Sequence, residues 1–184
     1  TGGTLVACLD DPGAAGIAAY AAEQGCDVIG YGLGPFDEEP PAVVRIAAIA
    51  PGGAQGQDQH FTITVDGRRI PVALHQPGHY NALNATAAVC TALALGYAPE
   101  EAAQGLAGYH GTRRRFEYRG QGSGVRVFDD YAHHPTEITA LLTAAKDVVD
   151  PGGRVHVVFQ PHLFSRTQNF RREFGTALGI ADAA

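Results

Sequence analysis

The stretch DDYAHHPTEI, which begins at Asp129, is the densest group of proton-carrying side chains in the chain. Asp129 and Asp130 can bind a metal, act as bases or cap the helix that follows, because Asp before a helix accepts hydrogen bonds from its free amides. His133 and His134 titrate near neutral pH and can donate to anionic oxygens. Since these groups are adjacent and stand beside Tyr131, a functional role is favoured over capping alone.

A second group follows in the segment QPHLFSRT. It places His162, Ser165, Arg166 and Thr167 around the start of a predicted helix. Free backbone amides and the helix dipole make such a position a natural site for an anion. The segment therefore predicts an anion site.

Consecutive arginines, Arg113, Arg114 and Arg115, lie in the segment GTRRRFE. A planar guanidinium grips phosphate with two hydrogen bonds, so the cluster suits a nucleotide or an acyl-phosphate, although a solvated loop would look the same. Asn81 and Asn84 stand near the beginning of an apolar helix, where their amides can hold a purine edge or cap the helix. On the residues alone, both interpretations stay open for each group.

Alternating strands and helices must position these side chains. The hydrophobic periodicity predicts, in order, strand 5–9, helix 13–24, strand 27–31, strand 43–49, a hairpin over 60–74 that turns at Asp66-Gly67, helices 80–95 and 99–108, a strand pair that turns at 120–124, helix 135–149, strand 155–160 and a helix from residue 165. Such alternation implies an α/β fold with parallel sheets, and these sheets bind ligands beyond the carboxyl ends of their strands. The two segments rich in histidine each follow a predicted strand.

The character of the chain changes near residue 112, so we expect one domain over 1–111 and a second over 112–184. The chain begins at Thr1 and enters a predicted strand almost at once. It stops after a helix, where an alternating α/β pattern would continue into another strand. We therefore expect both ends to be cut.

Composition argues against several classes of protein. A net charge of −6 and a pI near 5.7 argue against a nucleic-acid partner. Cys8, Cys26 and Cys90 lie far apart and follow no metal-ligand spacing, so a reduced, cytoplasmic environment is expected. No apolar run approaches the roughly 18 residues of a membrane span, and we expect no membrane insertion.

The sequence also lacks a phosphate loop. The only lysine is Lys146, and no GxxxxGK[ST] motif surrounds it. If ATP chemistry is involved, we expect part of the site to lie outside this chain.

Four segments occur in the order and spacing of the Mur ligases: GHYNALNATAAVCTAL, GTRRRFE, DDYAHHPTEI and FQPHLFSRTQNF. The resemblance is strong from about residue 78 to 184, and GGTLVACLDDPG extends it more weakly towards the start. It implies the later part of a central ATP-binding domain, followed by the first part of a Rossmann-like C-terminal domain with a parallel sheet. The pair DDYAHHPTE and FQPHLFSRT resembles the branch of the family that adds the first amino acid.

This resemblance implies an ATP-dependent ligase of peptidoglycan synthesis that joins L-alanine to UDP-N-acetylmuramate. In the family, the substrate carboxylate attacks the γ-phosphate of ATP, and the amino group of alanine captures the acyl-phosphate. Mg²⁺ neutralises the phosphates, and its ligands are expected mainly outside this chain, with no metal ligand within it. Without a phosphate loop, the chain alone is expected to be inactive.

Several residue roles follow from the same resemblance. Asn81 and Asn84 match the amides that hold adenine, and Arg115 matches the arginine at the ATP phosphates, a task that Arg114 shares. Asp130 resembles a ribose contact, and Tyr131 is expected to lie against the nucleotide.

The remaining roles concern the second substrate. His133, His134, His162 and Arg166 match positions where the muramyl lactate and the incoming alanine meet, and Arg115, Asp130 and His133 are the expected catalytic residues. Arg113 stands where Gly or Val is commoner. Leu163 replaces a usual Arg or His, which weakens the cationic role of that loop.

Other classes of function stay open. A non-catalytic nucleotide-binding module would bind ATP, whereas a scaffold with this fold would bind neither ATP nor a UDP-sugar. A ligase like folylpolyglutamate synthetase is a further alternative, which the DDYAHHP segment disfavours.

Overall fold

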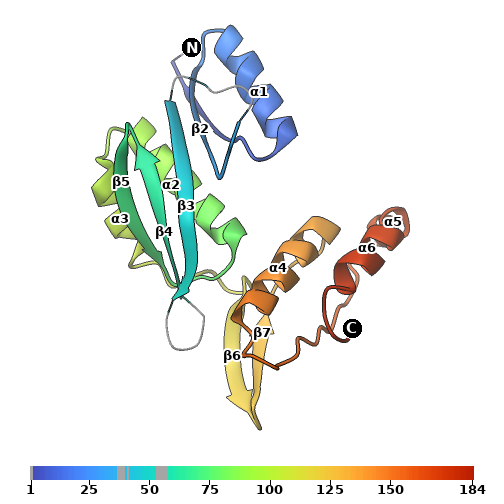
Figure 1. Ribbon diagram of the computed structural model, residues 1–184. Coiled ribbons are helices and arrows are strands. Elements are labelled where there is room, and N and C mark those ends of the chain that lie inside the picture. The colour runs from blue at the N-terminus through green and yellow to red at the C-terminus, as the bar shows by residue number, and fades with distance from the viewer. Residues whose placement is uncertain (1, 37–39, 41, 53–57) are drawn as a thin grey trace.

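The computed structural model describes residues 2–36, 40, 42–52 and 58–184. The elements in order are β1 (Thr4–Cys8), α1 (Pro12–Glu23), β2 (Asp27–Gly32), β3 (Ala42–Gly52), β4 (Asp58–Val65), β5 (Arg68–Leu74), α2 (His79–Ala94), α3 (Pro99–Leu106), β6 (Glu117–Gly122), β7 (Val125–Asp129), α4 (Pro135–Val148), α5 (Phe164–Asn169) and α6 (Arg171–Leu178). The larger sheet and its helices precede a linker, residues 107–116, after which the β6–β7 hairpin and the last three helices form a separate group (Figure 1).

The larger sheet has the strand order β1-β2-β3-β4-β5. β1, β2 and β3 are parallel, whereas β3, β4 and β5 are antiparallel. β4 and β5 turn at Asp66 and Gly67, whose φ angles of 48° and 76° are those that a tight hairpin turn needs. The predicted α/β fold with parallel strands and the predicted hairpin are therefore confirmed.

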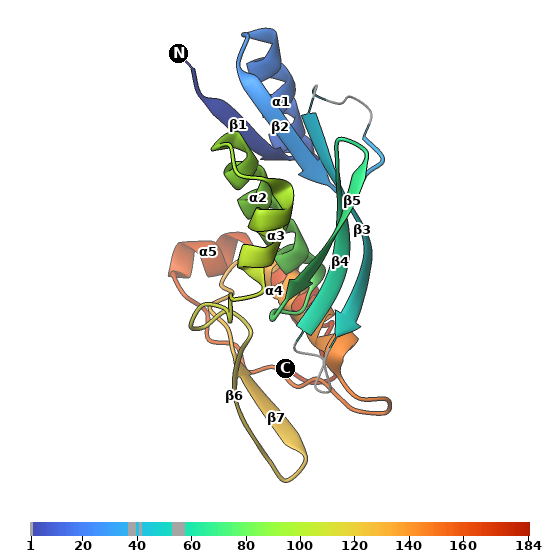
Figure 2. The same cartoon turned by 90° about the vertical axis from the view of Figure 1, so that its left-hand side faces the viewer.

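Helices cover both faces of this sheet because its apolar side chains alternate. In β1 and β2, Val6 and Ile29 belong to the core that α2 and α3 complete, whereas Ala7 and Val28 pack with Ala18 of α1. Figure 2 shows α2 and α3 side by side against β3, β4 and β5. Just before α2, the Gln76 side chain donates to the His110 carbonyl at 3.4 Å, which holds the start of α2 near the linker.

α1 and α4 begin with well-defined caps. Asp11 accepts a hydrogen bond from the Ala14 amide at 2.8 Å, and Pro12 follows it in the first turn. His134 caps α4 and Glu137 completes a capping box there. The expected helix starts after Asp11 and at Pro135 are therefore present.

The last part of the chain differs from the prediction at one segment. β7 pairs with β6 in an antiparallel hairpin, and residues 155–160, predicted as a strand, lie outside any named strand. In the described residues, their ladder consists of a single parallel bridge between His156 and Ala183. Val155, Val157 and Phe159 still point into the core of Ile138, Leu142, Phe174 and Ala177, which explains the alternating pattern that suggested a strand.

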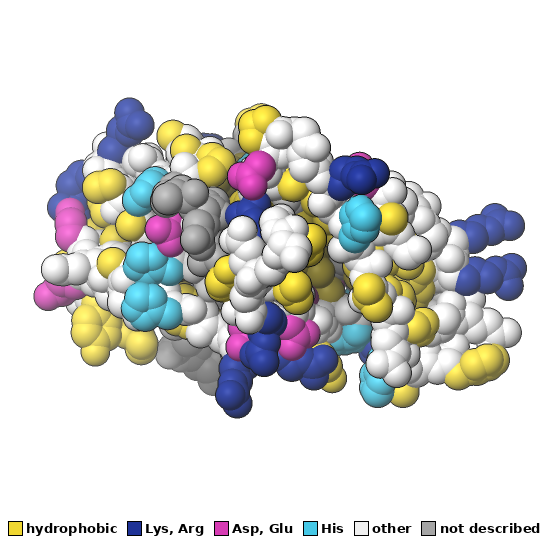
Figure 3. Space-filling view, turned by 90° about the horizontal axis from the view of Figure 1, so that it is seen from below, with side chains coloured by type: hydrophobic (Ala, Val, Ile, Leu, Met, Phe, Trp, Pro, Cys, Tyr) yellow, Lys and Arg dark blue, Asp and Glu magenta, His cyan; other side chains and the backbone are white. Residues whose placement is uncertain are grey.

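Charges are mixed on the surface that Figure 3 shows, where basic, acidic and histidine side chains are interspersed. None of the helices in the described part of the chain combines the length and the hydropathy that a membrane-crossing helix needs.

Candidate active site

Two adjacent carboxylates stand where β7 ends, and they have different partners. Asp130 accepts hydrogen bonds from the amides of Phe116 and Ala132, each at 2.7 Å. Asp129 lies 3.7 Å from Nε of Arg114 in an exposed ion pair. Asp130 therefore ties the arginine segment to the loop after β7, whereas Asp129 makes only a loose surface contact.

Burial raises the pKa of Asp130, and the amides of Phe116 and Ala132 and the charge of Arg115 offset part of that rise. Each carboxylate oxygen accepts one backbone hydrogen bond and keeps a second lone pair. Asp130 is therefore held in place and can still accept a hydrogen bond from a ligand hydroxyl.

Arg114 contacts the loop that follows β7. Its guanidinium carbon lies 4.6 Å from the centre of the Tyr131 ring, and its carbonyl oxygen accepts a 2.8 Å hydrogen bond from the Tyr131 amide. Its own amide donates to Glu117 at 2.8 Å, and its φ of 57° gives the backbone a sharp bend. These contacts of Arg114 hold Tyr131 in place.

The neighbouring arginines are different. Among the residues that the structure describes, Arg113 and Arg115 form neither a hydrogen bond nor an ion pair through their guanidinium groups, and both are exposed. The charge of Arg115 nevertheless acts on Tyr80, Asp130 and Glu137, so Arg115 lies close to all three. Its guanidinium is free to bind an anion beside Asp130.

Asn81 and Asn84 carry their side-chain amides near the start of α2. The Asn81 side chain donates to the Pro77 carbonyl at 2.7 Å, so it secures the helix start, while Asn84 is exposed on the same helix. Next to them, the hydroxyl of Tyr80 is buried, and no described residue forms a hydrogen bond with it. Burial, and then the Asp130 carboxylate, raise the pKa of Tyr80 to about 12, against smaller opposite effects of Asn81 and Arg115.

Tyr80 is a residue that the sequence analysis missed. Its neighbours Asn81 and Asn84 were predicted, but no local pattern distinguishes a tyrosine that faces a distant strand end from one that packs in a core. The effect of the Asp130 charge on Tyr80 depends on how α2 lies relative to β7, which is a tertiary property.

Both histidines after β7 are tied to Glu137. The amides of His133 and His134 donate to the same Glu137 oxygen at 2.9 and 3.0 Å. Nδ1 of His133 donates to the Tyr131 carbonyl at 2.9 Å, which leaves Nε2 free. Burial pushes the pKa of Glu137 upwards, but the two amides and the nearby cations hold it below its usual value.

His134 has mainly a local role in this arrangement. Its Nδ1 accepts a 3.4 Å hydrogen bond from the Thr136 amide, and its ring meets Phe170 edge to face at 4.9 Å. Glu137, which sequence analysis did not single out, completes the capping box three residues later, a spacing that is visible in the sequence.

The second predicted group lies on a separate segment. His162 is exposed, and Leu163 precedes α5 with a φ of 70°. Nη1 of Arg166 is buried without a partner in the described part of the chain. No hydrogen bond or ring contact found between described residues joins His162 or Arg166 to the loop after β7. The structure therefore brings together the residues from α2, the arginine segment and the end of β7, and the link from α5 to this group that it shows is the ring contact between Phe170 and His134 at 4.9 Å.

No group of three or more His, Cys, Asp or Glu side chains in the described ranges is placed to hold a metal ion.

The chain matches two protein families along most of its length. Residues 1–92 match the Mur ligase middle domain, and residues 114–184 match the family described as Mur ligase, glutamate ligase domain. A UDP-N-acetylmuramate--L-alanine ligase from Kineococcus radiotolerans is 50% identical over 184 residues, which cover 98% of this chain and 36% of that protein. The protein of the same name from Mycobacterium avium is 45% identical and is covered to 39%. The chain thus spans little more than a third of the length of these curated relatives.

Solved structures show the same fold. The UDP-N-acetylmuramate-alanine ligase from Thermotoga maritima superposes with a TM-score of 0.60 at 29% identity, over 84% of this chain and 32% of that one. Folylpolyglutamate synthetase from Lactobacillus casei superposes with a TM-score of 0.60 at 22% identity, over 89% of this chain and 39% of that one, a likeness in fold alone.

Proposed function

Because the chain belongs to the Mur ligase family, we propose that it forms part of a cytoplasmic, ATP-dependent ligase that joins L-alanine to UDP-N-acetylmuramate in peptidoglycan synthesis. The observation that carries this proposal is the 50% identity, over 98% of the chain, to a relative named for that reaction. We assign residues 1–111 to the later part of the ATP-binding domain and residues 112–184 to the first part of the Rossmann-like ligase domain.

ATP would lie between the start of α2 and the end of β7. Asn84 would offer its exposed amide to the adenine edge, and Asn81, which secures the start of the helix, would support it. Asp130 would accept hydrogen bonds from the ribose hydroxyls through its free lone pairs. The unpaired guanidinium of Arg115 suits the phosphates, because a planar guanidinium binds phosphate with two hydrogen bonds. Tyr131, held by Arg114, would form the wall of this groove.

The second substrate would enter from the side of His133. With Nδ1 donated to the Tyr131 carbonyl and Glu137 3.5 Å away, the ring can carry a proton on Nε2 and donate to negative charge that develops at the carboxyl under attack. The γ-phosphate of ATP would pass to that carboxylate, and the amino group of alanine would then displace phosphate. His134, His162 and Arg166 are assigned to the face where these two substrates meet.

Mg²⁺ would neutralise the phosphates during transfer, and no residue of the described ranges is assigned to it. The residues of this chain supply position and hydrogen bonds, which is the greater part of catalysis when a phosphoryl group is transferred.

The experiment is an assay of a protein in which this chain is joined to the segments that its relatives carry beyond it. Phosphate release that needs both UDP-N-acetylmuramate and L-alanine is the expected result. Release with a folate and glutamate instead would favour the folylpolyglutamate synthetase alternative. ATP binding without turnover under any of these conditions would favour a binding module.

Arg115→Lys in that protein tests the assigned phosphate contact. We expect turnover to fall by roughly tenfold or more, because an ammonium keeps the charge but loses the paired hydrogen bonds. Arg172→Lys, on an exposed position of α6, is the matched control and should leave the rate unchanged. A normal rate for Arg115→Lys would remove Arg115 from the site.

A further inference from the structure

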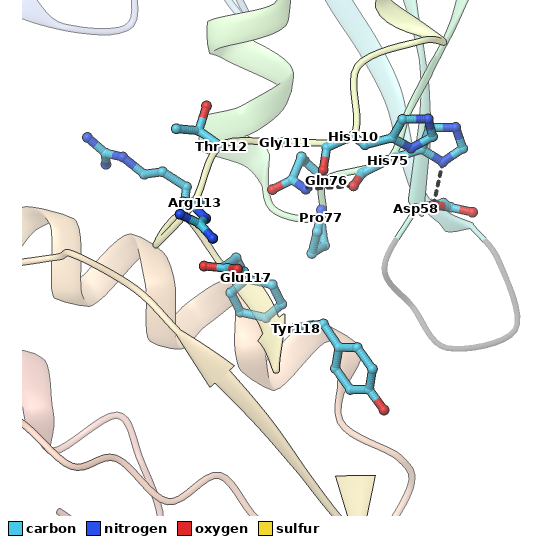
Figure 4. Close-up of a pocket in the computed structure, with 12 residues that line it drawn as sticks. Asp58, His75, Gln76, Pro77, His110, Gly111, Thr112, Arg113, Glu117 and Tyr118 are labelled. Carbon is cyan, nitrogen blue, oxygen red and sulfur yellow. Dashed lines mark hydrogen bonds and ion pairs between the residues drawn. The ribbon is translucent and has the colours of Figure 1, made fainter. Parts of the chain in front are cut away.

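The cavity beside the linker has Arg115 in its lining, so we count it as part of the groove proposed for ATP (Figure 4). Glu137 does not line this cavity and stands in the first turn of α4. Its Oε2 accepts hydrogen bonds from the amides of His133 at 2.9 Å and His134 at 3.0 Å. The same oxygen lies 3.5 Å from Nδ1 of the His133 ring. One carboxylate oxygen therefore contacts both the backbone and the ring of His133.

The hydrogen bond of Nδ1 decides which form of His133 can donate to a substrate. Nδ1 lies 2.9 Å from the Tyr131 carbonyl, and a carbonyl oxygen only accepts, so Nδ1 carries a hydrogen. A neutral imidazole has a single N–H, so neutral His133 has a bare Nε2 that can only accept a hydrogen bond. The donor at Nε2 that the proposed function needs therefore exists only in the imidazolium form.

Glu137 supplies the charge that favours this form. Burial pushes the pKa of Glu137 upwards, but the two backbone amides and then the charge of His133 bring it below its usual value. Attraction between opposite charges stabilises both partners, so the carboxylate favours the protonated ring in turn. Among the described residues, the ion pair of this ring is the one with Glu137. The other ionisable groups around the pair come from the loop after β7 and from the arginine segment: Asp130, Tyr131, His134, Arg114 and Arg115.

We propose that Glu137 is a positioning residue, whose carboxylate holds His133 as an imidazolium with a hydrogen on Nε2 for the second substrate. The role in the reaction rests on the proposed function, whereas the link between the carboxylate and the ring does not. It also differs from capping, because a capping box uses Glu or Gln alike. Glu137→Gln separates the two roles, since the amide oxygen can replace Oε2 at both backbone amides while the charge is lost.

The first measurement is the protonation of the His133 ring in the 184-residue chain, followed by ¹⁵N NMR of the imidazole nitrogens as the pH is raised. In Glu137→Gln the protonated ring should give way to the neutral ring about 0.2–0.7 pH units earlier than in the unmodified chain, the scale of a partly exposed ion pair. His60, exposed on β4, is the internal reference. Glu173→Gln, in the first turn of α6, is the matched control and should leave the His133 titration unchanged. Equal His133 titrations in Glu137→Gln and the unmodified chain would overturn the proposal.

The second measurement is the rate of the longer ligase as a function of pH. Glu137→Gln should lower kcat by roughly two- to fivefold above neutral pH, with KM for ATP unchanged. Its rate should approach that of the unmodified ligase at lower pH, where the ring is protonated without help from the carboxylate. In a His133→Ala background, Glu137→Gln should have no further effect, because its effect passes through the ring.

The two measurements keep this inference apart from the proposed function. An unchanged rate profile, a loss that is equal at every pH, or a loss that persists without the imidazole would overturn the role of Glu137 in the reaction. A longer protein without ligase activity would instead refute the proposed function. The ring titration in the 184-residue chain would still decide whether Glu137 holds His133 protonated.

Discussion

At the scale of single residues, Asp129 and Asp130 are neighbours in sequence with very different structural roles. Asp130→Asn should lower the free energy of unfolding by about 1–3 kcal/mol, because an amide group cannot accept from both the Phe116 and Ala132 amides. Asp129→Asn should cost less than about 1 kcal/mol, since it removes only an exposed ion pair with Arg114. Urea unfolding of the two variants measures the difference. Equal losses would mean that the two Asp130 hydrogen bonds contribute little.

The sequence indicated which residues cluster after β7, but it did not indicate which contacts each of these side chains makes. The cluster after β7 was recognisable because carboxylates, imidazoles and a tyrosine are adjacent in the chain. The expected role of Arg114 beside the phosphates stays a prediction, whereas its contact with the Tyr131 ring was not expected from the sequence. That contact depends on the bend at Arg114, where φ is 57°, and a backbone bend of this kind in a non-glycine residue has no reliable sequence signal.

At the scale of elements, α2 begins in close contact with α4. A Cβ at Gly78 would lie 2.8 Å from a ring carbon of Tyr80 and 2.9 Å from Cβ of Ala144, and φ at Gly78 is 97°. Gly67 has a comparable φ of 76° but open space around it. Gly78→Ala should therefore destabilise the chain by about 1–3 kcal/mol more than Gly67→Ala, because only the first adds overpacking to backbone strain. Similar losses of stability for the two variants in thermal unfolding would show that α4 moves away from a Cβ at residue 78 at little cost.

The segment after α6 is held by one carboxylate. Asp182 accepts hydrogen bonds from Nζ of Lys146 at 2.6 Å and from the Val155 amide at 2.7 Å, and these two contacts lower its pKa below the ordinary 3.8. The folded chain therefore releases this proton more readily than the unfolded chain does. The resulting stabilisation is present above the ordinary pKa and is lost as the pH falls through the lower, folded value.

Asp182→Asn should remove this pH dependence. Near neutral pH, we expect Asp182→Asn to have a lower free energy of unfolding than the unmodified chain. Below about pH 4, the free energies of unfolding of the two chains should converge. Unfolding curves across that range measure the effect, and amide exchange at Val155 locates it. Asp147→Asn, an exposed change on α4, is the control. A constant difference at all pH values would show that Asp182 does not titrate with folding.

Element prediction succeeded where the pattern and the local chemistry agree. The Asp66-Gly67 turn, the Asp11 cap and the Pro135 helix start all follow from residues within a few positions of one another. Residues 155–160 show the opposite case. Their alternation reflects burial against α4 and α6, but a strand also needs a ladder partner, and periodicity alone does not report one.

At the scale of the whole molecule, the hydroxyl of Tyr80 lies where the two parts of the chain meet. It belongs to α2, the charge of Asp130 at the end of β7 acts on it, and no hydrogen-bond partner for it is found among the described residues. A buried hydroxyl without a partner opposes folding by a free energy of about 1–3 kcal/mol. If the nucleotide proposed above binds beside Asp130, it can supply an acceptor for this hydroxyl.

Tyr80→Phe tests whether the Tyr80 hydroxyl forms a hydrogen bond only when a ligand is bound. In the free chain we expect unchanged stability or a gain of up to about 1 kcal/mol, because the change removes an unpaired polar group and keeps the ring. In the longer protein, ATP should raise the melting temperature less for Tyr80→Phe than for the unmodified protein, since the bound state loses a hydrogen bond that the free state never had. Tyr118→Phe, on the exposed face of β6, controls for loss of a hydroxyl in general. A free chain that is destabilised by Tyr80→Phe would show that the hydroxyl is already satisfied, and an equal ATP effect in both proteins would exclude it from the bound state.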